Sequence, residues 1–183
     1  DLRTYQHAED AEAVNRGLTV QRNYYAGGTG CPGAAGCESI QGLRLDESEP
    51  TQTVVVSLTV NVPHDMYHFM LQDHIPSGTE VLDKSLKTAR QGDGAPEQEG
   101  LEPRYDPLAP FKSGWGWWWF DDPKIYNDHL LWTAEYLPAG TFTLVYQLVP
   151  LQRGEYQVLP AHAWQYFFPE VMGTSAGSVF TIE

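Results

Sequence analysis

Apolar and polar residues alternate most regularly over residues 53–62. Every second position from Val54 onwards is apolar, whereas the positions between are small and polar apart from Val55. This period of two predicts a β-strand with one face buried in a core. Pro63 interrupts the alternation at a short turn, and a second strand is predicted at 66–72.

The same alternation returns in shorter segments along the chain. At 141–149, alternate positions are again large and apolar. The remaining predicted strands cover residues 17–25, 129–136, 155–159 and 178–182. Seven or eight short strands with turn signals between them predict an all-β fold, an antiparallel β-sandwich with at most a short helix.

Three segments do not alternate. Residues 1–16 have helix-forming composition with a weak apolar stripe, and we predict a linker or a short helix there. Residues 84–91 are suited to one or two helical turns. Residues 90–113 are rich in Pro, Gly and acidic residues, and so long a loop is uncommon in a compact domain. Because strand alternation resumes after it, we interpret it as an insertion within a single domain covering 1–183.

The charge of the chain restricts its partners. The formal net charge is −13 and the sequence pI is near 4.7. Such a chain repels phosphate backbones and anionic membrane surfaces, so we expect no nucleic-acid partner. No apolar run approaches the roughly 18 residues of a membrane-spanning helix. The chain opens on Asp1 instead of Met, so we expect it to be a piece of a longer precursor.

Two cysteines, Cys31 and Cys37, flank a short stretch of Pro, Gly and Ala. Two thiols alone exclude a four-cysteine zinc site within the chain. In an oxidising compartment they would close a disulfide worth about 2 kcal/mol in the chain-entropy treatment. We predict this disulfide and, with it, an extracytoplasmic location; the alternative is a pair of reduced cytosolic thiols.

No constellation of polar residues predicts catalysis. His64, Asp65 and His68 lie close together, with Asp73 and His74 further on. On a strand, His64 and His68 would share a face but stand roughly 13 Å apart, too far to chelate one ion. The carboxylates at 121–122 lack the spacing of a calcium loop. There is no Gly-x-Ser-x-Gly elbow and no phosphate-binding glycine loop. We therefore expect neither an enzyme nor a cofactor or metal site.

Tryptophans gather in an unusual cluster at Trp115, Trp117, Trp118 and Trp119. On a strand, Trp117 and Trp119 would share one face while Trp118 takes the other. The plainest interpretation is that one face fills the core. The alternatives are a protein-interaction patch and a platform on which sugars stack.

The last third of the chain contains a characteristic series of motifs. Leu-Pro-Ala-Gly-Thr at 137–141 precedes Tyr146, Arg-Gly-Glu-Tyr at 153–156 precedes Pro160, and Tyr-Phe-Phe-Pro-Glu-Val-Met-Gly stands at 166–173. This series resembles the C-terminal end of bacterial alpha-2-macroglobulins. Segments 17–25, 53–62 and 71–80 resemble the same family, so the resemblance covers nearly the whole chain. Residues 90–128 and the cysteine loop match it least.

The resemblance implies a C-terminal domain with a macroglobulin-like, immunoglobulin-like sandwich and no catalytic activity. Members of this family are large proteins of the periplasm or cell surface that trap proteases, and many carry a Cys–Gln thioester in a separate helical domain. The implied partners are other domains of the same parent chain, above all the thioester domain, and target proteases through the parent. This chain itself has no thioester motif.

The resemblance also assigns a role to the loop of Tyr166, Phe167, Phe168 and Pro169. In the family, this loop helps to shield the thioester from water. The family commonly has Met-Tyr in this loop, and Tyr166 stands at the shielding position here. The alternative, from the residues alone, is that these aromatic side chains pack in the core. The alternative function is carbohydrate binding through Trp117 and Trp119.

Overall fold

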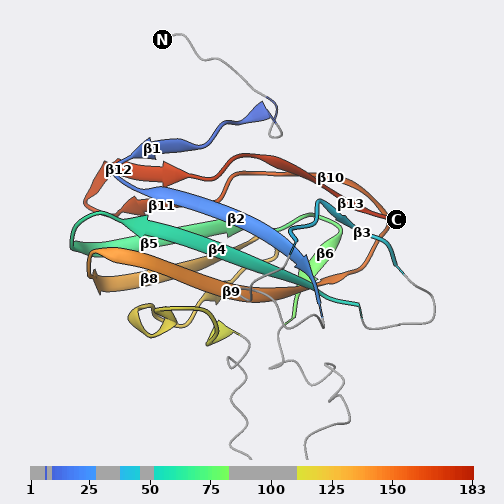
Figure 1. Cartoon of the computed structure of the whole chain (residues 1–183), viewed down its shortest axis with the longest axis horizontal. Helices are drawn as coiled ribbons and strands as arrows, with labels where there is room; N and C mark the ends of the chain where they lie inside the picture. Colours follow the sequence, from blue (N-terminus) through green and yellow to red (C-terminus); the bar gives the residue numbers. More distant parts are fainter. Residues whose placement is uncertain (1–6, 8–9, 28–37, 46–51, 83–110) are drawn as a thin grey trace, which may run out of the picture.

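The structure is a computed structural model that describes residues 7, 10–27, 38–45, 52–82 and 111–183. Within these ranges the chain forms thirteen strands and the short 3-10 helix η3 (Trp117–Trp119), which confirms the predicted all-β fold (Figure 1). The strands are β1 (Val14–Arg16), β2 (Thr19–Ala26), β3 (Gly42–Leu43), β4 (Val54–Val62), β5 (Met66–His74), β6 (Thr79–Val81), β7 (Lys124–Ile125), β8 (His129–Leu137), β9 (Gly140–Pro150), β10 (Gly154–Val158), β11 (His162–Gln165), β12 (Phe168–Thr174) and β13 (Ser178–Ile182). No helix in the described ranges is long and apolar enough to cross a membrane.

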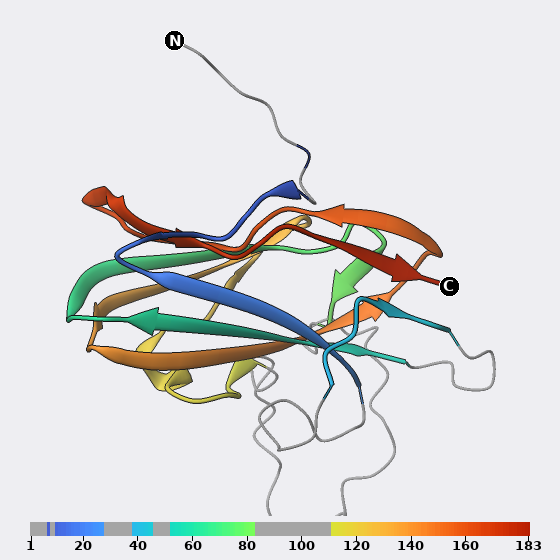
Figure 2. The same ribbon diagram turned by 45° about the horizontal axis from the view of Figure 1, so that its top comes forward.

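The strands pair into three sheets. A six-stranded sheet has the order β1-β12-β11-β5-β8-β7, a four-stranded sheet the order β2-β4-β9-β6, and a three-stranded sheet the order β10-β13-β3. The two larger sheets face each other as the layers of a sandwich (Figure 2). Strand pairs are antiparallel except β13 with β3. The two best-predicted strands, β4 and β5, follow one another in the chain but belong to opposite layers.

The core lies between the two layers. The predicted inward face of β4 is fully buried and consists of Val54, Val56, Leu58, Val60 and Val62. Val55, the exception to the alternation, is also buried, at 4% exposure. From the opposite layer, Trp132 of β8 reaches Tyr146 of β9 with 5.7 Å between ring centroids. Aromatic and β-branched side chains from both layers therefore fill one continuous core.

The N-terminal segment departs from the prediction. Val14, Asn15 and Arg16 form β1, which pairs antiparallel with β12, and all three residues are exposed. An edge strand that buries neither face shows no apolar alternation, so its sequence cannot be distinguished from that of a linker. The predicted linker or short helix at 1–16 is therefore wrong for these three residues.

The segment 111–123 closes the side of the sandwich between β8 and β9. The N–H of Thr143 on β9 donates to the carbonyl of Trp115 at 2.8 Å, and the N–H of Asp121 donates to the carbonyl of Thr133 on β8, also at 2.8 Å. The segment thus covers a free edge of the layer that contains β9 and continues to the layer that contains β8. In Figure 1 it lies below β8 and β9.

The tryptophan cluster is not a strand. Residues 117–119 form η3, preceded by Gly114 and Gly116 with φ of +100° and +80°. The predicted sharing of one face by Trp117 and Trp119 is therefore wrong. The aromatic residue that enters the core is the next one, Phe120, which meets Phe69 and Phe142 edge-on with centroids 5.9 Å away in both cases.

Several predictions lie outside the described residues. These are the disulfide between Cys31 and Cys37, the helical turns at 84–91 and all but the last three positions of the loop at 90–113. Phe111, at the end of that loop, is buried at 4% exposure.

Candidate interaction site

The tip of the β11–β12 hairpin presents three consecutive aromatic residues to solvent. Tyr166, Phe167 and Phe168 are 59%, 63% and 55% exposed, and Pro169 beside them is exposed as well. The alternative in which these aromatic residues pack in the core is therefore wrong. The hairpin projects at the same end of the sandwich as the β4–β5 and β8–β9 turns (Figure 1).

His68 of β5 holds this tip in place. The N–H of Tyr166 donates to the His68 carbonyl at 2.9 Å, and the His68 and Phe167 rings meet edge-to-face at 4.9 Å. His68 has a φ of +53°, a conformation that costs a non-glycine residue roughly 1–2 kcal/mol. The β11–β12 register also shifts between Trp164 and Gln165. Both irregularities lie where the tip meets β5. The contacts that His68 makes there provide an ordered base for the exposed rings.

An open hollow with a volume of about 430 Å³ lies beside the tip. Tyr166 and Phe167 contribute aromatic surface to its lining, whereas Asp121 and Glu135 contribute carboxylates. Met70 adds flexible apolar surface to the lining. The lining of the hollow is therefore partly aromatic and apolar and partly acidic.

Asp65 fastens the neighbouring turns at the same end. Its carboxylate accepts hydrogen bonds from the Ala139 N–H at 2.9 Å and from the Tyr136 hydroxyl at 2.8 Å. These bonds favour the ionised form and hold the pKa of Asp65 below its ordinary value, while the bond to Asp65 raises the pKa of Tyr136. The β4–β5 and β8–β9 turns are thereby joined by one side chain.

The tryptophans form a second exposed aromatic surface. Trp115, Trp118 and Trp119 are 68%, 53% and 40% exposed, whereas Trp117 packs partly against the core. Trp118 meets Trp115 at an interplanar angle of 80° and Trp117 at 81°. Rings at right angles do not make a flat platform. Trp119 also contacts Tyr136, which links this surface to the turns fastened by Asp65.

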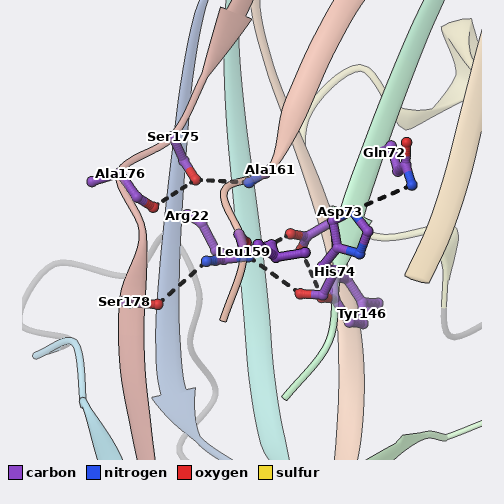
Figure 3. A network of polar contacts seen from close by, with 10 residues as sticks. All are labelled: Arg22, Gln72, Asp73, His74, Tyr146, Leu159, Ala161, Ser175, Ala176 and Ser178. Carbon is purple, nitrogen blue, oxygen red and sulfur yellow. Dashed lines mark hydrogen bonds and ion pairs between the residues drawn. The ribbon is translucent and has the colours of Figure 1, made fainter. Parts of the chain in front are cut away.

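A polar network centred on Arg22 is buried instead (Figure 3). The Arg22 guanidinium lies 2.8 Å from the Asp73 carboxylate and donates to the carbonyls of His74 and Leu159. The Tyr146 hydroxyl donates to the other Asp73 oxygen at 2.7 Å, and burial raises the pKa of Tyr146 well above its ordinary value. The network joins β2, β5 and β9 to the residue that follows β10, and it ties these strands together through buried charged groups.

The roles of His68 and Asp65 were not predicted from the sequence. Both were weighed only as metal ligands, because histidine and aspartate close together suggest that chemistry. Nothing in the sequence signals the positive φ of His68. The short break after Pro63 could have suggested that Asp65 caps a turn, since Asp favours such positions.

These features define a β-sandwich domain with an ordered, aromatic surface at one end. The family of bacterial alpha-2-macroglobulin MG10 domains matches residues 17–170. The chain therefore belongs to that family, which confirms the resemblance seen in the sequence. A search of curated proteins gives no match.

Solved structures agree on the fold. The native alpha-2-macroglobulin of Escherichia coli, in a structure from domain MG7 to the C-terminus, is 20% identical with a TM-score of 0.63, over 93% of this chain and 24% of that one. The trypsin-activated protein of the same species is 18% identical with a TM-score of 0.65, over 94% and 11%. A Salmonella alpha-2-macroglobulin variant is 18% identical with a TM-score of 0.62, over 93% and 9%. This chain thus spans about a quarter or less of the length of these relatives.

Proposed function

We propose that this chain is a non-enzymatic docking domain that packs against another domain of its own parent protein through the β11–β12 tip. The observation that carries the proposal is the exposure of Tyr166, Phe167 and Phe168 on an ordered base. Three adjacent aromatic residues in water are costly unless a partner covers them, and aromatic residues are enriched where proteins meet.

The family supports a neighbouring domain of the same chain as that partner. The E. coli and Salmonella relatives extend far beyond the matched region, so in those chains an MG10-like domain has other domains beside it. We propose that the parent is an extracytoplasmic protease trap and that its thioester domain is the surface contacted. The Tyr166 ring would then exclude water from the thioester, with Phe167 and Phe168 completing the contact.

The test uses the full-length parent protein and the reaction of its thioester with methylamine. The substitution Tyr166→Ala removes the proposed shield, so we expect a free thiol to appear faster after methylamine is added. Tyr126→Ala is the matched control. Tyr126 is also exposed, at 45%, and it lies near the end of β8 remote from the tip.

An unchanged methylamine rate in Tyr166→Ala would refute the shielding role. Equal acceleration in Tyr126→Ala would assign the effect to general loosening of the domain. Replacing Phe167→Ala separates docking from shielding, because a docking role predicts weaker contact between the domains, seen as new protease cleavage at their junction.

Carbohydrate binding is less well supported. The Trp118 ring meets those of Trp115 and Trp117 at nearly right angles, so these rings do not form one flat surface on which a sugar chain could stack. On affinity gels that contain polysaccharide, we therefore expect the chain to migrate as it does on gels without it.

A further inference from the structure

Two histidines and an aspartate from separate parts of the chain converge at the end of the sandwich remote from the aromatic tip. His74 is the last residue of β5 and His129 the first of β8, and the two strands place them directly opposite each other. Asp128 immediately precedes His129. One donor atom from each of the three side chains lies within 4.8 Å of the other two.

The strand pairing explains this closeness. The N–H of Ile75 donates to the carbonyl of Asp128 at 3.0 Å, so the His74–His129 pair is flanked by a hydrogen bond and is of the non-hydrogen-bonded type. Side chains stand closest in pairs of this type. The two imidazole rings are accordingly 5.6 Å apart between centroids.

The surrounding contacts hold the His129 ring and the His74 main chain in place. The Tyr126 ring stacks on His129 at 4.4 Å with an interplanar angle of 15°, and Asp128 Oδ1 lies 2.7 Å from His129 Nδ1. The His74 main chain is fixed because its carbonyl accepts from Arg22 and the side chain before it, Asp73, is locked in the core (Figure 3).

The polar side chain beside the His74 ring leaves its Nε2 atom available to a ligand. The Gln72 amide lies 3.4 Å from His74 Nε2, a long and weak hydrogen bond. A metal ion can replace it at little cost.

We propose that His74, Asp128 and His129 bind one divalent transition-metal ion of the zinc class. Two imidazoles and one carboxylate match the donors that Zn²⁺ and its neighbours prefer, whereas Ca²⁺ and Mg²⁺ require an all-oxygen set. Three protein ligands leave an open position, and the Asp128 side chain is 74% exposed, so solvent or a ligand from another molecule completes the coordination. This proposal is independent of the docking function.

The ion would act as a staple between β5 and β8. It would bind the folded chain more tightly than the unfolded chain, in which His74 is far from the adjacent Asp128 and His129. Stability then rises with the concentration of metal by mass action.

The experiment is isothermal titration calorimetry of Zn²⁺ into the full chain carrying Cys31→Ser and Cys37→Ser, so that no reduced cysteine can compete for the ion. We expect saturable binding of one ion per chain. His129→Gln and Asp128→Asn should each weaken it by at least about tenfold. His64→Gln is the matched control, because His64 is exposed and lies outside the cluster. This variant should bind Zn²⁺ as tightly as the chain that carries only the two cysteine substitutions.

Absence of saturable binding would overturn the proposal, and so would equal weakening by His64→Gln. A second measurement needs no substitution at the proposed ligands, so it does not depend on whether those variants fold. Titration with paramagnetic Cu²⁺ should broaden the NMR amide signals of residues 74, 128 and 129 before those of His64 or His162. Broadening centred on another histidine would equally overturn the assignment.

Discussion

Arg22 and Asp73 form a charged pair inside the sandwich, with side chains only 2% and 0% exposed. Each charge is compensated by the other and by hydrogen bonds, from Tyr146 to Asp73 and from Arg22 to two main-chain carbonyls. A buried charge that loses its partner is destabilising by several kcal/mol, because it is desolvated without compensation. The pair therefore restricts how β2 and β5 can be arranged.

We expect Asp73→Ala to lower the free energy of unfolding by about 3–5 kcal/mol, because the Arg22 charge would remain buried alone. Urea denaturation followed by far-UV circular dichroism measures the change. The matched control is the exposed pair of Arg44 and Glu183, whose side chains are 86% and 62% exposed. Arg44→Ala should change the free energy by no more than about 1 kcal/mol. Similar values for the two substitutions would contradict the role given to the buried pair.

The sequence did not reveal this pair. Asp73 shares the buried face of its strand with Phe69 and Leu71, and Arg22 lies on the face of Val20 and Tyr24 in another predicted strand. Pairing between sheets cannot be read from alternation, which reports only which positions of one strand share a face. The convergence of His74 with His129 was not predicted either, because alternation does not show which strands are neighbours within a sheet.

At the scale of elements, prediction succeeded where one face of a strand is buried. The strand expected at 53–62 is β4, and that expected at 66–72 is most of β5. Prediction failed at β1, because a strand exposed on both faces has no apolar alternation. It also failed at the tryptophan cluster, where the residues that follow two glycines form η3 and not a strand. The segment 114–120 is shaped by the positive φ of two glycines, which composition does not reveal.

Gly114→Ala tests how this segment is held. A Cβ at Gly114 would collide with the Thr143 carbonyl oxygen, and its φ of +100° disfavours any other residue. We expect a loss of more than about 1 kcal/mol in the free energy of unfolding and faster hydrogen exchange at the Thr143 amide. Gly140→Ala is the control, since the nearest atom to its Cβ is on the Phe142 ring at 3.6 Å, an ordinary contact. Unchanged exchange at Thr143 would show that Trp115 is not held by β9.

At the scale of the whole molecule, one apolar core connects all three sheets. Val158, Phe180 and Ile182 of the three-stranded sheet belong to the same core cluster as the residues of the two larger layers. Phe180 is fully buried and its ring lies 4.8 Å from that of Tyr24 on β2. The family match ends at residue 170, so Phe180 and Ile182 lie beyond it, whereas Val158 lies within it.

This continuity predicts that the chain unfolds as one domain, as expected from the sequence. In urea, tryptophan fluorescence and far-UV circular dichroism should give coincident transitions. Phe180→Ala should lower the free energy of unfolding by about 3–5 kcal/mol and shift both transitions together, because a cavity in a shared core weakens every sheet that lines it. Leu151→Ala, at a position 64% exposed, is the control and should leave both midpoints in place. If Phe180→Ala instead separates the two transitions, the C-terminal sheet is an independent unit and the chain contains more than one domain.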